Sequence, residues 1–365
     1  MKNFLYSGML VVTVLFSRCG NIPESAGTDS LWDDRTVEVA TSTVPCDDEA
    51  LLTGGMEISG DRVVMYNISQ PDLFGCFRLR NDSLVFVAPL QKRGNGPYET
   101  LMSQAVFMPE CDGLFLIDRQ TGRKAFRIDS ADPEKWSDVK SWRAFELPNK
   151  PNLMSIVPTD CSGGFIAQLL DDRRHMFCTF RSGDSTVAPL SIPYPEASEG
   201  CPDISLGIAC RGTLQKRPGS QEYVFSAQNS RYVVVFSLKE GQAADIRLLY
   251  DTPPQFTLAS DGINPRISGE TLSGFYVQAT RKYIYLTPRN HRDADTKALE
   301  RSPAFGTAYE TFVFDWEGNP VRKILADKPL QTAAFTDDDR FLYAKTADPQ
   351  QSDECLVRGR ILPTE

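Results

Sequence analysis

The segment SGDRVVMY, residues 59–66, decides the fold, because its pattern of a polar turn followed by a short apolar strand returns five more times along the chain. The later copies are CDGLFLID (111–118), SGGFIAQL (162–169), GSQEYVFSA (219–227), TRKYIYL (280–286) and DDRFLYAK (338–345). The residues equivalent to Val63 are Leu114, Phe165, Tyr223, Tyr283 and Phe341. Successive copies therefore lie 51, 51, 58, 60 and 58 residues apart. A near-constant period of this size indicates a repeat architecture rather than unrelated domains.

Each copy fits one strand of a four-stranded unit. A further strand candidate precedes each later copy, and most copies are followed by two more, as in HMFCTF (175–180) and VAPLSIP (187–193). Runs such as LFLI (114–117) and YVVVF (232–236) are apolar at consecutive positions. Such runs indicate strands buried on both faces, as in a blade packed between two neighbours. Six units of this kind predict an all-β fold, a six-bladed β-propeller with four-stranded antiparallel blades.

The N-terminal region is predicted to close the ring. An open ring would leave an exposed edge strand, so propellers usually pair strands from the two ends of the chain. We expect the segment RTVEVATS, residues 35–42, to complete the last blade, whose own strands run through RFLYAK (340–345) and CLVRGRI (355–361). One short helix is predicted within SADPEKWSDVKSW (130–142), with Ser130 as its N-cap.

The first residues have the pattern of an export signal. Lys2 precedes an apolar run from Phe4 to Phe16, which is shorter than the roughly 20 apolar residues of a membrane-spanning helix. Cys19 follows this run directly, as in bacterial lipoproteins, where cleavage before a cysteine lets that residue carry lipid. Because Arg18 stands where such signals usually have a small residue, a buried or disulfide-bonded Cys19 is the alternative.

Three regions are therefore expected: a lipoprotein signal peptide over residues 1–18, a tether over 19–34 and a propeller domain over 35–365. In this interpretation the protein is exported and anchored in the bacterial cell envelope, at the outer membrane. Its contact with the membrane is through lipid on Cys19 only, and we expect a monomer.

The charge of the chain argues against nucleic acid as a partner. Loss of Lys2 and Arg18 from the 39 basic side chains leaves 37 against 48 acidic ones, a net charge of −11. Nucleic-acid binding depends on clustered Lys and Arg that neutralise phosphates, and the basic runs here are no longer than three residues.

The cysteines do not suggest a structural zinc site. The eight that follow Cys19 lack the close pairs of tetrahedral zinc motifs. In an exported protein, Cys201 and Cys210, which bracket PDISLGIA, can close a short disulfide loop. Alternatively, most of the cysteines, among them Cys76 and Cys178, serve as small apolar side chains within strands.

Four segments carry a resemblance to a known family. They are KRGNGPYE (92–99), YVQATRKYIYL (276–286), VFDWEGNPVRKI (313–324) and RFLYA (340–344). With these segments and its lipoprotein-like start, the chain resembles the TolB-like six-bladed β-propeller lipoproteins of Bacteroides and its relatives over nearly its whole length. The resemblance implies architecture and envelope location, but no reaction.

The first of these segments also has the look of a phosphate-binding loop. Gly94 and Gly96 lie beside two basic residues, but a dinucleotide fingerprint needs a third glycine where this chain has Glu99. Pro97 also removes one backbone N–H that a phosphate would use. We therefore expect this loop to be a connection between blades rather than a ligand site. In such a connection Glu99 accepts hydrogen bonds from the backbone or from Arg93.

Candidate catalytic residues are few. The two histidines, His175 and His291, each lie among charged residues, which favours solvated loop or strand-end positions over a general base. Acidic clusters at 46–49, 170–174 and 336–340 can supply oxygen ligands to calcium, although turn capping by Asp explains them more simply. No cofactor is expected, except that calcium held in the central channel by carboxylates of different blades stays open.

A charged insertion, residues 289–306, interrupts the fifth repeat. It carries the basic residues Arg289, His291, Arg292, Lys297 and Arg301. On an acidic chain these side chains can offer local positive charge to an anionic glycan or an acidic protein patch. The alternative is a loop whose charges only keep it solvated.

Two functions are compatible with this sequence. The first is a non-catalytic binding or scaffold module for an envelope protein, peptide or glycan. The second is a metal-dependent hydrolase of the lactonase type with a carboxylate-lined central channel. The lack of a catalytic motif favours the first. Three or more Asp, Glu or Asn side chains converging on the ring axis would favour the second.

Overall fold

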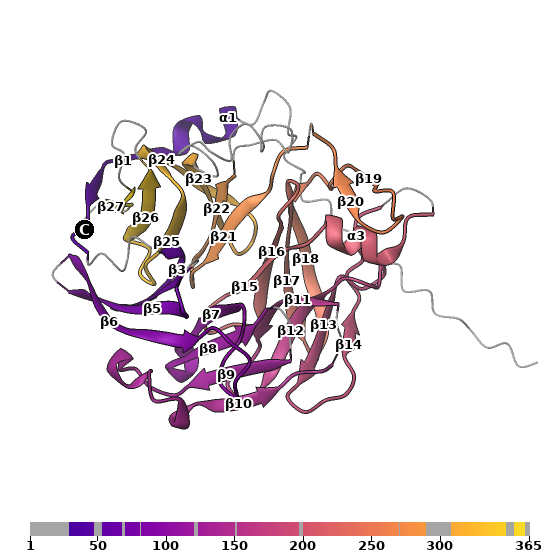
Figure 1. Cartoon of the computed structure of the whole chain (residues 1–365). Helices are drawn as coiled ribbons and strands as arrows, with labels where there is room; N and C mark the ends of the chain where they lie inside the picture. The colour runs from indigo at the N-terminus through magenta and orange to yellow at the C-terminus, as the bar shows by residue number, and fades with distance from the viewer. Residues whose placement is uncertain are drawn as a thin grey trace, which may run out of the picture.

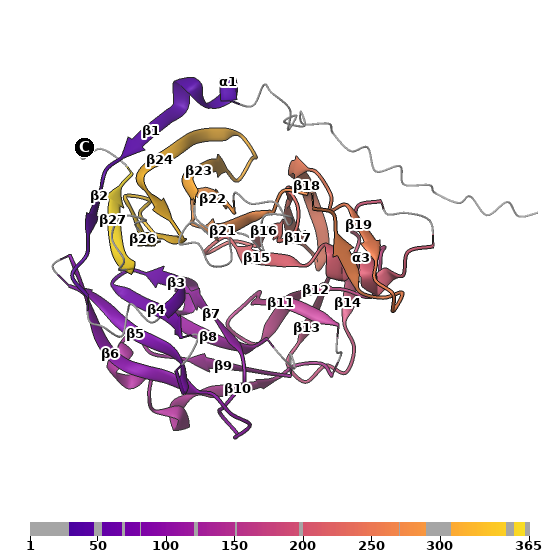
Figure 2. The ribbon, with the colours of Figure 1, turned by 45° about the horizontal axis from the view of Figure 1, so that its top comes forward.

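The blades of the protein are arranged in a ring (Figure 1). The computed structural model describes residues 29–46, 53–67, 70–80, 82–119, 123–149, 152–196, 200–269, 271–289, 308–347 and 354–361. Figure 2 shows the ring from a second direction, with the strands β3, β7, β11, β15 and β21 toward the middle. The predicted all-β six-bladed propeller with four-stranded antiparallel blades is confirmed.

Blades 1 to 3 each contain four strands that are consecutive in the chain. Blade 1 consists of β3 (Thr53–Ser59), β4 (Arg62–Asn67), β5 (Asp72–Arg80) and β6 (Ser83–Lys92). Blade 2 consists of β7 (Ser103–Met108), β8 (Gly113–Asp118), β9 (Lys124–Ile128) and β10 (Arg143–Glu146). Blade 3 consists of β11 (Leu153–Pro158), β12 (Gly164–Leu169), β13 (Phe177–Arg181) and β14 (Ala188–Leu190).

Blades 4 to 6 follow the same plan, with additions. Blade 4 consists of β15 (Gly212–Lys216), β16 (Glu222–Ala227), β17 (Tyr232–Lys239) and β18 (Gln242–Asp251). Blade 5 contains β21 (Phe275–Ala279), β22 (Tyr283–Pro288), β23 (Ala308–Asp315) and β24 (Pro320–Leu330). Blade 6 contains β25 (Thr332–Phe335), β26 (Phe341–Ala347) and β27 (Glu354–Arg360). The hairpin of β19 (Phe256–Leu258) and β20 (Pro265–Ile267) and the helix α3 (Asp203–Ala209) lie in connections between blades.

The six repeated segments all supply the second strand of a blade. These strands are the buried ones: every residue of β8 and β12 is buried, as their apolar runs predict. Aromatic rings join neighbouring blades. Tyr285 of blade 5 stacks on Phe335 of blade 6 with ring centroids 3.7 Å apart, and Phe177 of blade 3 meets Phe225 of blade 4 at 5.2 Å.

The N-terminal segment closes the ring, but it spans two blades instead of one. β2 (Thr41–Thr43) pairs antiparallel with β27 and so completes blade 6, as predicted. β1 (Thr36–Val39) instead pairs in parallel with β24 and adds a fifth strand to blade 5. The prediction for residues 35–42 was therefore right only for the end of the segment. Separate outer edges of adjacent blades both offer unpaired backbone groups, and an extended chain can pair with one and then the other.

The folded region begins before residue 35, which corrects the expected extent of the tether. Residues Asp29–Trp32 form the short helix α1, and Asp33–Arg35 form the 3-10 turn η1. Trp32 is 1% exposed and packs against Phe312 and Phe314 of blade 5, with ring centroids 5.3 and 5.4 Å away. A large apolar side chain in a supposed tether is buried because blade 5 offers it an aromatic surface. Residues 1–28, which include the predicted signal peptide and Cys19, lie outside the described part.

The predicted helix within 130–142 is two separate 3-10 turns, η3 (Pro133–Lys135) and η4 (Val139–Ser141). Asp132 and Asp138 cap them, so the prediction of Ser130 as the N-cap was wrong. Trp136 and Trp142 are both buried in one apolar cluster. One α-helix would turn residues six apart to directions about 120° from each other, so two short turns bury both rings better.

The predicted disulfide was also wrong. Cys201 and Cys210 are free and buried, whereas Cys111 and Cys161 form a disulfide that links blades 2 and 3. Helix α3 lies between Cys201 and Cys210, and at 1.5 Å rise per residue it holds their Cα atoms roughly 10 Å or more apart, beyond the reach of about 7 Å for a disulfide. Cys76 and Cys178 form no disulfide in the described part and are buried within strands, as expected for small apolar side chains.

Candidate functional site

The glycine-rich loop after β6 is filled by a side chain of the protein itself. The backbone N–H of Gly96 donates to Oε2 of Glu99 at 2.9 Å. A Cβ atom on Gly94 would lie 2.1 Å from the same oxygen, so only glycine leaves room for this carboxylate. Arg93 donates to the carbonyls of Leu101 and Asn67 at 2.9 and 3.1 Å. The anion in this cradle is thus Glu99, and no space for a phosphate remains beside Gly94.

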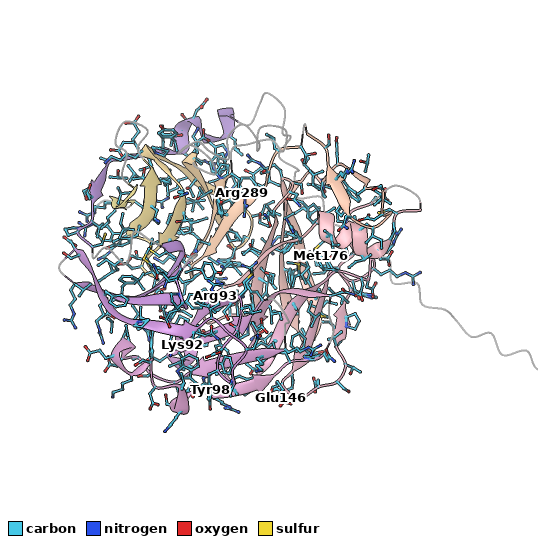
Figure 3. The ribbon with its side chains drawn as sticks, viewed as in Figure 1. Lys92, Arg93, Tyr98, Glu146, Met176 and Arg289 are labelled. Carbon is cyan, nitrogen blue, oxygen red and sulfur yellow. A yellow bond between two sulfur atoms is a disulfide. The ribbon has the colours of Figure 1, made fainter. Side chains whose placement is uncertain are left out.

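The same loop anchors blade 1 to blade 2. Tyr98 packs against Phe126 and Trp142 of blade 2, with ring centroids 5.8 and 6.2 Å away. Figure 3 shows Lys92, Arg93 and Tyr98 together at this junction. The structure therefore places Gly94, Gly96, Pro97 and Glu99 in a connection between blades.

Three inner strands bring polar side chains together at the ring axis. On β3, Glu57 is partly exposed between the buried residues Met56 and Ile58, because alternate residues of a strand point to opposite faces. The Glu57 carboxyl is hydrogen-bonded to the side chains of Gln215 on β15 and Gln278 on β21. Blades 1, 4 and 5 are therefore joined across the axis by one carboxyl and two amides.

The position of Glu57 changes its acidity. Burial raises the pKa of its carboxyl from the ordinary 4.5 to about 7, although the hydrogen bonds with Gln215 and Gln278 oppose the rise. Desolvation disfavours the charged carboxylate more than these two amides stabilise it. The carboxyl of Glu57 therefore stays protonated to a higher pH than an exposed glutamate does.

A cavity of about 50 Å³ adjoins this group. Besides Glu57, Gln215 and Gln278, its lining includes Glu110, Lys216 and Asp337. Lys216 forms an ion pair with Glu110, and Asp337 accepts hydrogen bonds from the Gly60 N–H at 2.9 Å and the Ser59 hydroxyl at 3.3 Å. Carboxyl groups from three blades thus face the axial cavity. Within the described part of the chain, no three His, Cys, Asp or Glu side chains are grouped closely enough to hold a metal ion by themselves.

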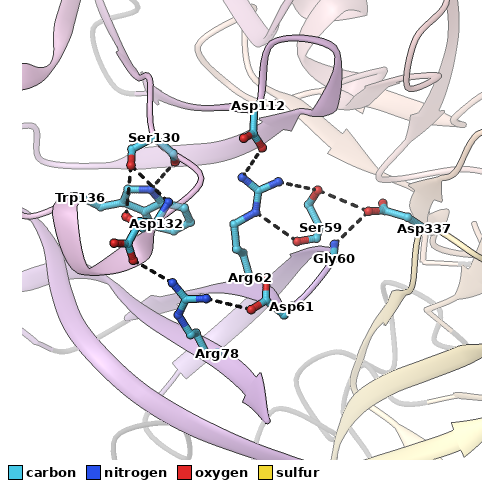
Figure 4. A network of polar contacts seen from close by, with 10 residues as sticks. All are labelled: Ser59, Gly60, Asp61, Arg62, Arg78, Asp112, Ser130, Asp132, Trp136 and Asp337. Atoms are coloured by element: carbon cyan, nitrogen blue, oxygen red, sulfur yellow. Dashed lines mark hydrogen bonds and ion pairs between the residues drawn. The ribbon is translucent and has the colours of Figure 1, made fainter.

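Beside the cavity, ion pairs join blade 1 to blade 2, and hydrogen bonds join blade 1 to blade 6 (Figure 4). Arg62 pairs with Asp112 of blade 2 at 2.7 Å. Arg78 lies between Asp61 at 2.9 Å and Asp132 at 2.7 Å. Since Asp337 of blade 6 bonds to the turn at Gly60, this network holds the turns of three blades in place around one end of the channel.

The acidic cluster 336–340 folds into this framework, whereas residues 47–49 of the cluster 46–49 lie outside the described part of the chain. In the cluster 336–340, Asp338 caps its own turn by accepting from the Arg340 N–H at 3.1 Å. Asp339 is buried and accepts from the hydroxyls of Thr280 at 2.6 Å and Tyr285 at 2.9 Å in blade 5. In this cluster, Asp338 therefore caps a turn, and Asp339 forms hydrogen bonds between blades 5 and 6.

An open groove with a volume of about 550 Å³ lies between blades 3 and 4. Its walls include the polar side chains of Thr159, Asp160, Thr179, Arg181, Asp184, Thr186, Gln221 and Glu240. The apolar lining residues are Phe165, Phe180, Val187, Ala188 and Leu238. Arg181 pairs with Asp160 at 3.3 Å, so Asp184 and Glu240 give the groove a net negative charge.

The wall of this groove in blade 3 is an incomplete strand edge. The outer strand β14 pairs with Phe177, Cys178 and Thr179 of β13 and stops short of Phe180 and Arg181. Residues 184–187, which lead into β14, are mostly exposed and lie outside any strand. The backbone N–H and C=O of Arg181, the next outward-facing residue of β13, are already bonded to Asp184, so this wall offers the exposed backbone of residues 185–187 to an added extended chain.

A second surface pocket, of about 490 Å³, lies beside α3. His175 lines it, with Nδ1 2.8 Å from Oδ2 of Asp172 in the same turn. Arg173 also lines it and pairs with Asp203 at the start of α3. His175 is partly exposed at the end of a turn, which agrees with a solvated position.

Of the basic residues in the insertion 289–306, the structure describes Arg289. Its guanidinium lies over the ring of Tyr276, 4.1 Å from the ring centroid. Burial lowers the pKa of Arg289, Tyr276 opposes that shift, and the positive charge of Arg211 adds to it. His291, Arg292, Lys297 and Arg301 lie outside the described residues, so their part in a contact surface stays a prediction.

The axial residues were missed by the sequence analysis. Glu57 precedes its strand anchor Val63 by six positions, whereas Gln215 and Gln278 precede Tyr223 and Tyr283 by eight and five. Because the turn between first and second strands varies in length, alignment of the repeats does not bring the three together. The one available signal was a polar residue within an otherwise apolar first strand, as in GGMEIS (54–59).

Comparison with known proteins agrees with this architecture. A family model described as TolB-like 6-blade propeller-like matches residues 36–338. A solved structure of a DUF4221-family member from Bacteroides vulgatus is similar over 87% of this chain and 95% of its own, at 10% identity and a TM-score of 0.55. At this identity the likeness concerns the fold alone. No curated protein matches the chain.

Two further solved structures are similar at TM-scores below 0.5. A gluconolactonase from Xanthomonas campestris is similar over 90% of this chain and 88% of its own, at 12% identity and a TM-score of 0.44. The Swd1 β-propeller domain of Myceliophteria thermophila is similar over 85% and 97%, at 12% identity and 0.43. As a separate finding, the helices in the described part are too short or too polar to cross a bilayer.

Proposed function

The chain belongs to the TolB-like six-bladed propeller family, and from this premise we propose that it is a non-catalytic binding module of the bacterial cell envelope. Its ligand is an extended peptide segment of an envelope protein. The segment lies in the groove between blades 3 and 4 and pairs with the exposed backbone of residues 185–187, which lead into β14.

The observation that carries this proposal is the difference in volume between the groove and the axial cavity. Ligand sites usually have volumes of roughly 300–1,000 Å³. The groove between blades 3 and 4 has about 550 Å³, whereas the axial cavity has about 50 Å³. A peptide therefore has room in the groove, while the axial cavity has room for little more than a few water molecules.

The groove has the chemistry of a peptide site. Exposed backbone at 185–187 can form main-chain hydrogen bonds, and Thr186 and Gln221 can bond to polar side chains of the ligand. The carboxylates of Asp184 and Glu240 favour a segment that carries Lys or Arg. Phe180 and Val187 contribute apolar side chains to the lining of the groove.

The proposal includes export and lipid anchoring through Cys19 at the outer membrane. The disulfide between Cys111 and Cys161 supports export, because disulfides persist in oxidising compartments and are rare in the cytosol. The apolar run from Phe4 to Phe16 and the cysteine behind it support a lipoprotein signal.

The test uses two matched substitutions. Thr186→Trp fills the groove from an exposed position, and Thr257→Trp places the same ring on an exposed position of β19. Loss of partner capture from solubilised envelopes in the first variant, with normal capture in the second, supports the groove. Equal capture by both variants excludes it. Capture of glycan without protein would retain the binding function and change the ligand class.

A second candidate, a metal-dependent hydrolase of the lactonase type, is favoured by one observation. Burial raises the pKa of Glu57 to about 7, which suits a general base, although the cavity of about 50 Å³ beside it would have to widen to admit a lactone. Metal-dependent turnover of lactones or esters by the purified protein, abolished in Glu57→Gln, would establish this activity in place of the binding function.

A further inference from the structure

We propose that the partner segment continues beyond the groove onto a basic surface between blades 4 and 5, and that it carries acidic residues there. The basic surface consists of Arg217, Arg247, Arg281 and Lys282. This inference rests on the proposed function, because it extends the segment that the groove would bind. The partner segment is therefore mixed in charge, with Lys or Arg in the groove and Asp or Glu beyond it.

The groove and the basic surface lie at the same end of the ring. The groove is lined by the turns that join first to second and third to fourth strands in blades 3 and 4, as at Asp160 and Glu240. Arg217 lies in the turn between β15 and β16, and Arg281 and Lys282 lie in the equivalent turn between β21 and β22. Since neighbouring strands of these blades run in opposite directions, all these turns are at one end. A segment bound in the groove can therefore reach the basic surface without crossing the ring.

The turn of residues 217–221 in blade 4 connects the two surfaces. On one side, the Gln221 side chain lines the groove and donates to the Thr159 carbonyl of blade 3 at 3.0 Å. On the other side, Nε of Arg217 donates to the Arg281 carbonyl of blade 5 at 2.8 Å. These contacts hold the turn against both neighbouring blades. The groove and the basic surface are therefore adjacent, with one short turn between them.

Two cations of the basic surface are held in place by their neighbours. Glu222 pairs with Arg217 and, at 3.9 Å, with Arg247. The Arg217 guanidinium also lies 5.5 Å from the ring centroid of Trp316, whose carbonyl accepts from Arg247 at 2.8 Å. One carboxylate thus serves two guanidinium groups, which leaves positive charge at this position.

The other two cations are exposed. Arg281 and Lys282 lie at the surface, and neither side chain forms an ion pair within the described part of the chain. Of the nearby acids, Asp315 accepts two hydrogen bonds within its own turn, and Asp339 is buried. Glu317, on the exposed turn of blade 5, offsets part of the charge. Neighbouring exposed cations on an acidic chain favour an acidic segment.

The distance between the two surfaces sets the spacing of charges in the partner. Packed sheets lie roughly 10 Å apart, and the groove and the basic surface are on opposite faces of blade 4. An extended chain covers about 3.3 Å per residue. We therefore expect about three to six residues between the basic and the acidic positions of the segment.

The test is titration of fluorescent peptides at low salt, followed by anisotropy. A split-charge peptide has a run of Lys, a neutral spacer of about four residues and a run of Glu, and it is made in both sequence orders. A basic peptide has Gln in place of Glu. In one order the split-charge peptide should bind about fivefold more tightly than the basic peptide, because two exposed charge pairs are added. Arg281→Glu combined with Lys282→Glu should remove this gain without weakening the basic peptide.

The control is Lys135→Glu combined with Lys140→Glu, which makes the same charge change at exposed positions of blade 2 and should keep the gain. Thr186→Trp should weaken both peptides, because both use the groove. Circular dichroism of each variant checks the fold.

The outcomes separate this inference from the proposed function. Groove binding by the basic peptide, with no gain from the acidic run, overturns the inference and leaves the proposed function standing. Absence of binding by either peptide, or binding that Thr186→Trp does not change, overturns both. Dextran sulfate bound through Arg281 and Lys282, without a gain for the split-charge peptide, assigns the basic surface to an anionic glycan and overturns the inference.

Discussion

Asp327 accepts two hydrogen bonds from Thr41, one from its backbone N–H at 3.0 Å and one from its hydroxyl at 2.7 Å. This contact lies where the N-terminal segment leaves the edge of blade 5 and joins blade 6. One carboxylate on the outer strand of blade 5 thus fixes the start of the strand that completes blade 6. Behind it, Gly359 admits the side chain of Val39, which would lie 2.4 Å from a Cβ atom at that position.

We predict that Asp327→Ala loosens this closure. Two bonds to a charged acceptor at an exposed position contribute about 1–2 kcal/mol together. Hydrogen exchange should become faster in residues 36–43, while the strands of blade 3 keep their protection. Uniformly faster exchange throughout the ring would show that the contact does not act locally.

Trp32→Ala should cost about 3–5 kcal/mol of unfolding free energy, because it removes a buried ring from the blade 5 surface. Leu31→Ala, a partly buried neighbour in α1, serves as the control and should cost much less. Urea denaturation followed by tryptophan-independent circular dichroism gives both values. Equal and small effects would mean that residues 29–34 are a tether after all.

The stability of the protein should fall as pH rises from about 4.5 to about 7. The pKa of Glu57 is 4.5 ordinarily and about 7 in the folded protein, so the folded state binds more protons across this window. Stability is then greatest below pH 4.5 for this group and is lost as pH passes through 7. Allowing for water in the channel, the change is about 2 kcal/mol. Glu57→Gln should flatten this part of the profile, and an unchanged profile would assign the titration to another group.

Replacement of both Cys111 and Cys161 by Ser should lower the unfolding free energy by about 2–4 kcal/mol. Mass spectrometry of the alkylated, non-reduced protein should find these two cysteines protected and Cys201 and Cys210 modified after unfolding. Protection of Cys201 and Cys210 would restore the disulfide that the spacing of the sequence suggests.

Cys19→Ala should release the protein from the membrane fraction, because the proposed anchor is lipid on that residue alone. The folded propeller should remain intact, with unchanged circular dichroism. Retention of the variant in the membrane fraction would show that another contact holds it there.

The sequence was sufficient for the ring because each second strand is buried on both faces and so carries the same apolar signal, from Val63 to Phe341. It was insufficient where one segment serves two partners, as at residues 36–43, since strand propensity does not identify the neighbour. Cys111 and Cys161 are 50 residues apart in the chain, and only the packing of adjacent blades brings them together.

The axial group shows the same limit for function. Glu57, Gln215 and Gln278 lie in three repeats with different turn lengths, and their meeting depends on the closed ring. The groove between blades 3 and 4 exists because β14 is short. The short pairing of β14 with β13 cannot be predicted from the amino-acid composition of the segment.

The central claim is that a partner segment lies in the groove between blades 3 and 4. The most direct measurement is photo-crosslinking in living cells from a photoreactive amino acid at position 186, with position 257 as the control. We predict adducts at position 186 that map by mass spectrometry to one extended segment of one envelope protein, and none at position 257. No adduct at position 186, or the same adducts at both positions, would contradict the claim.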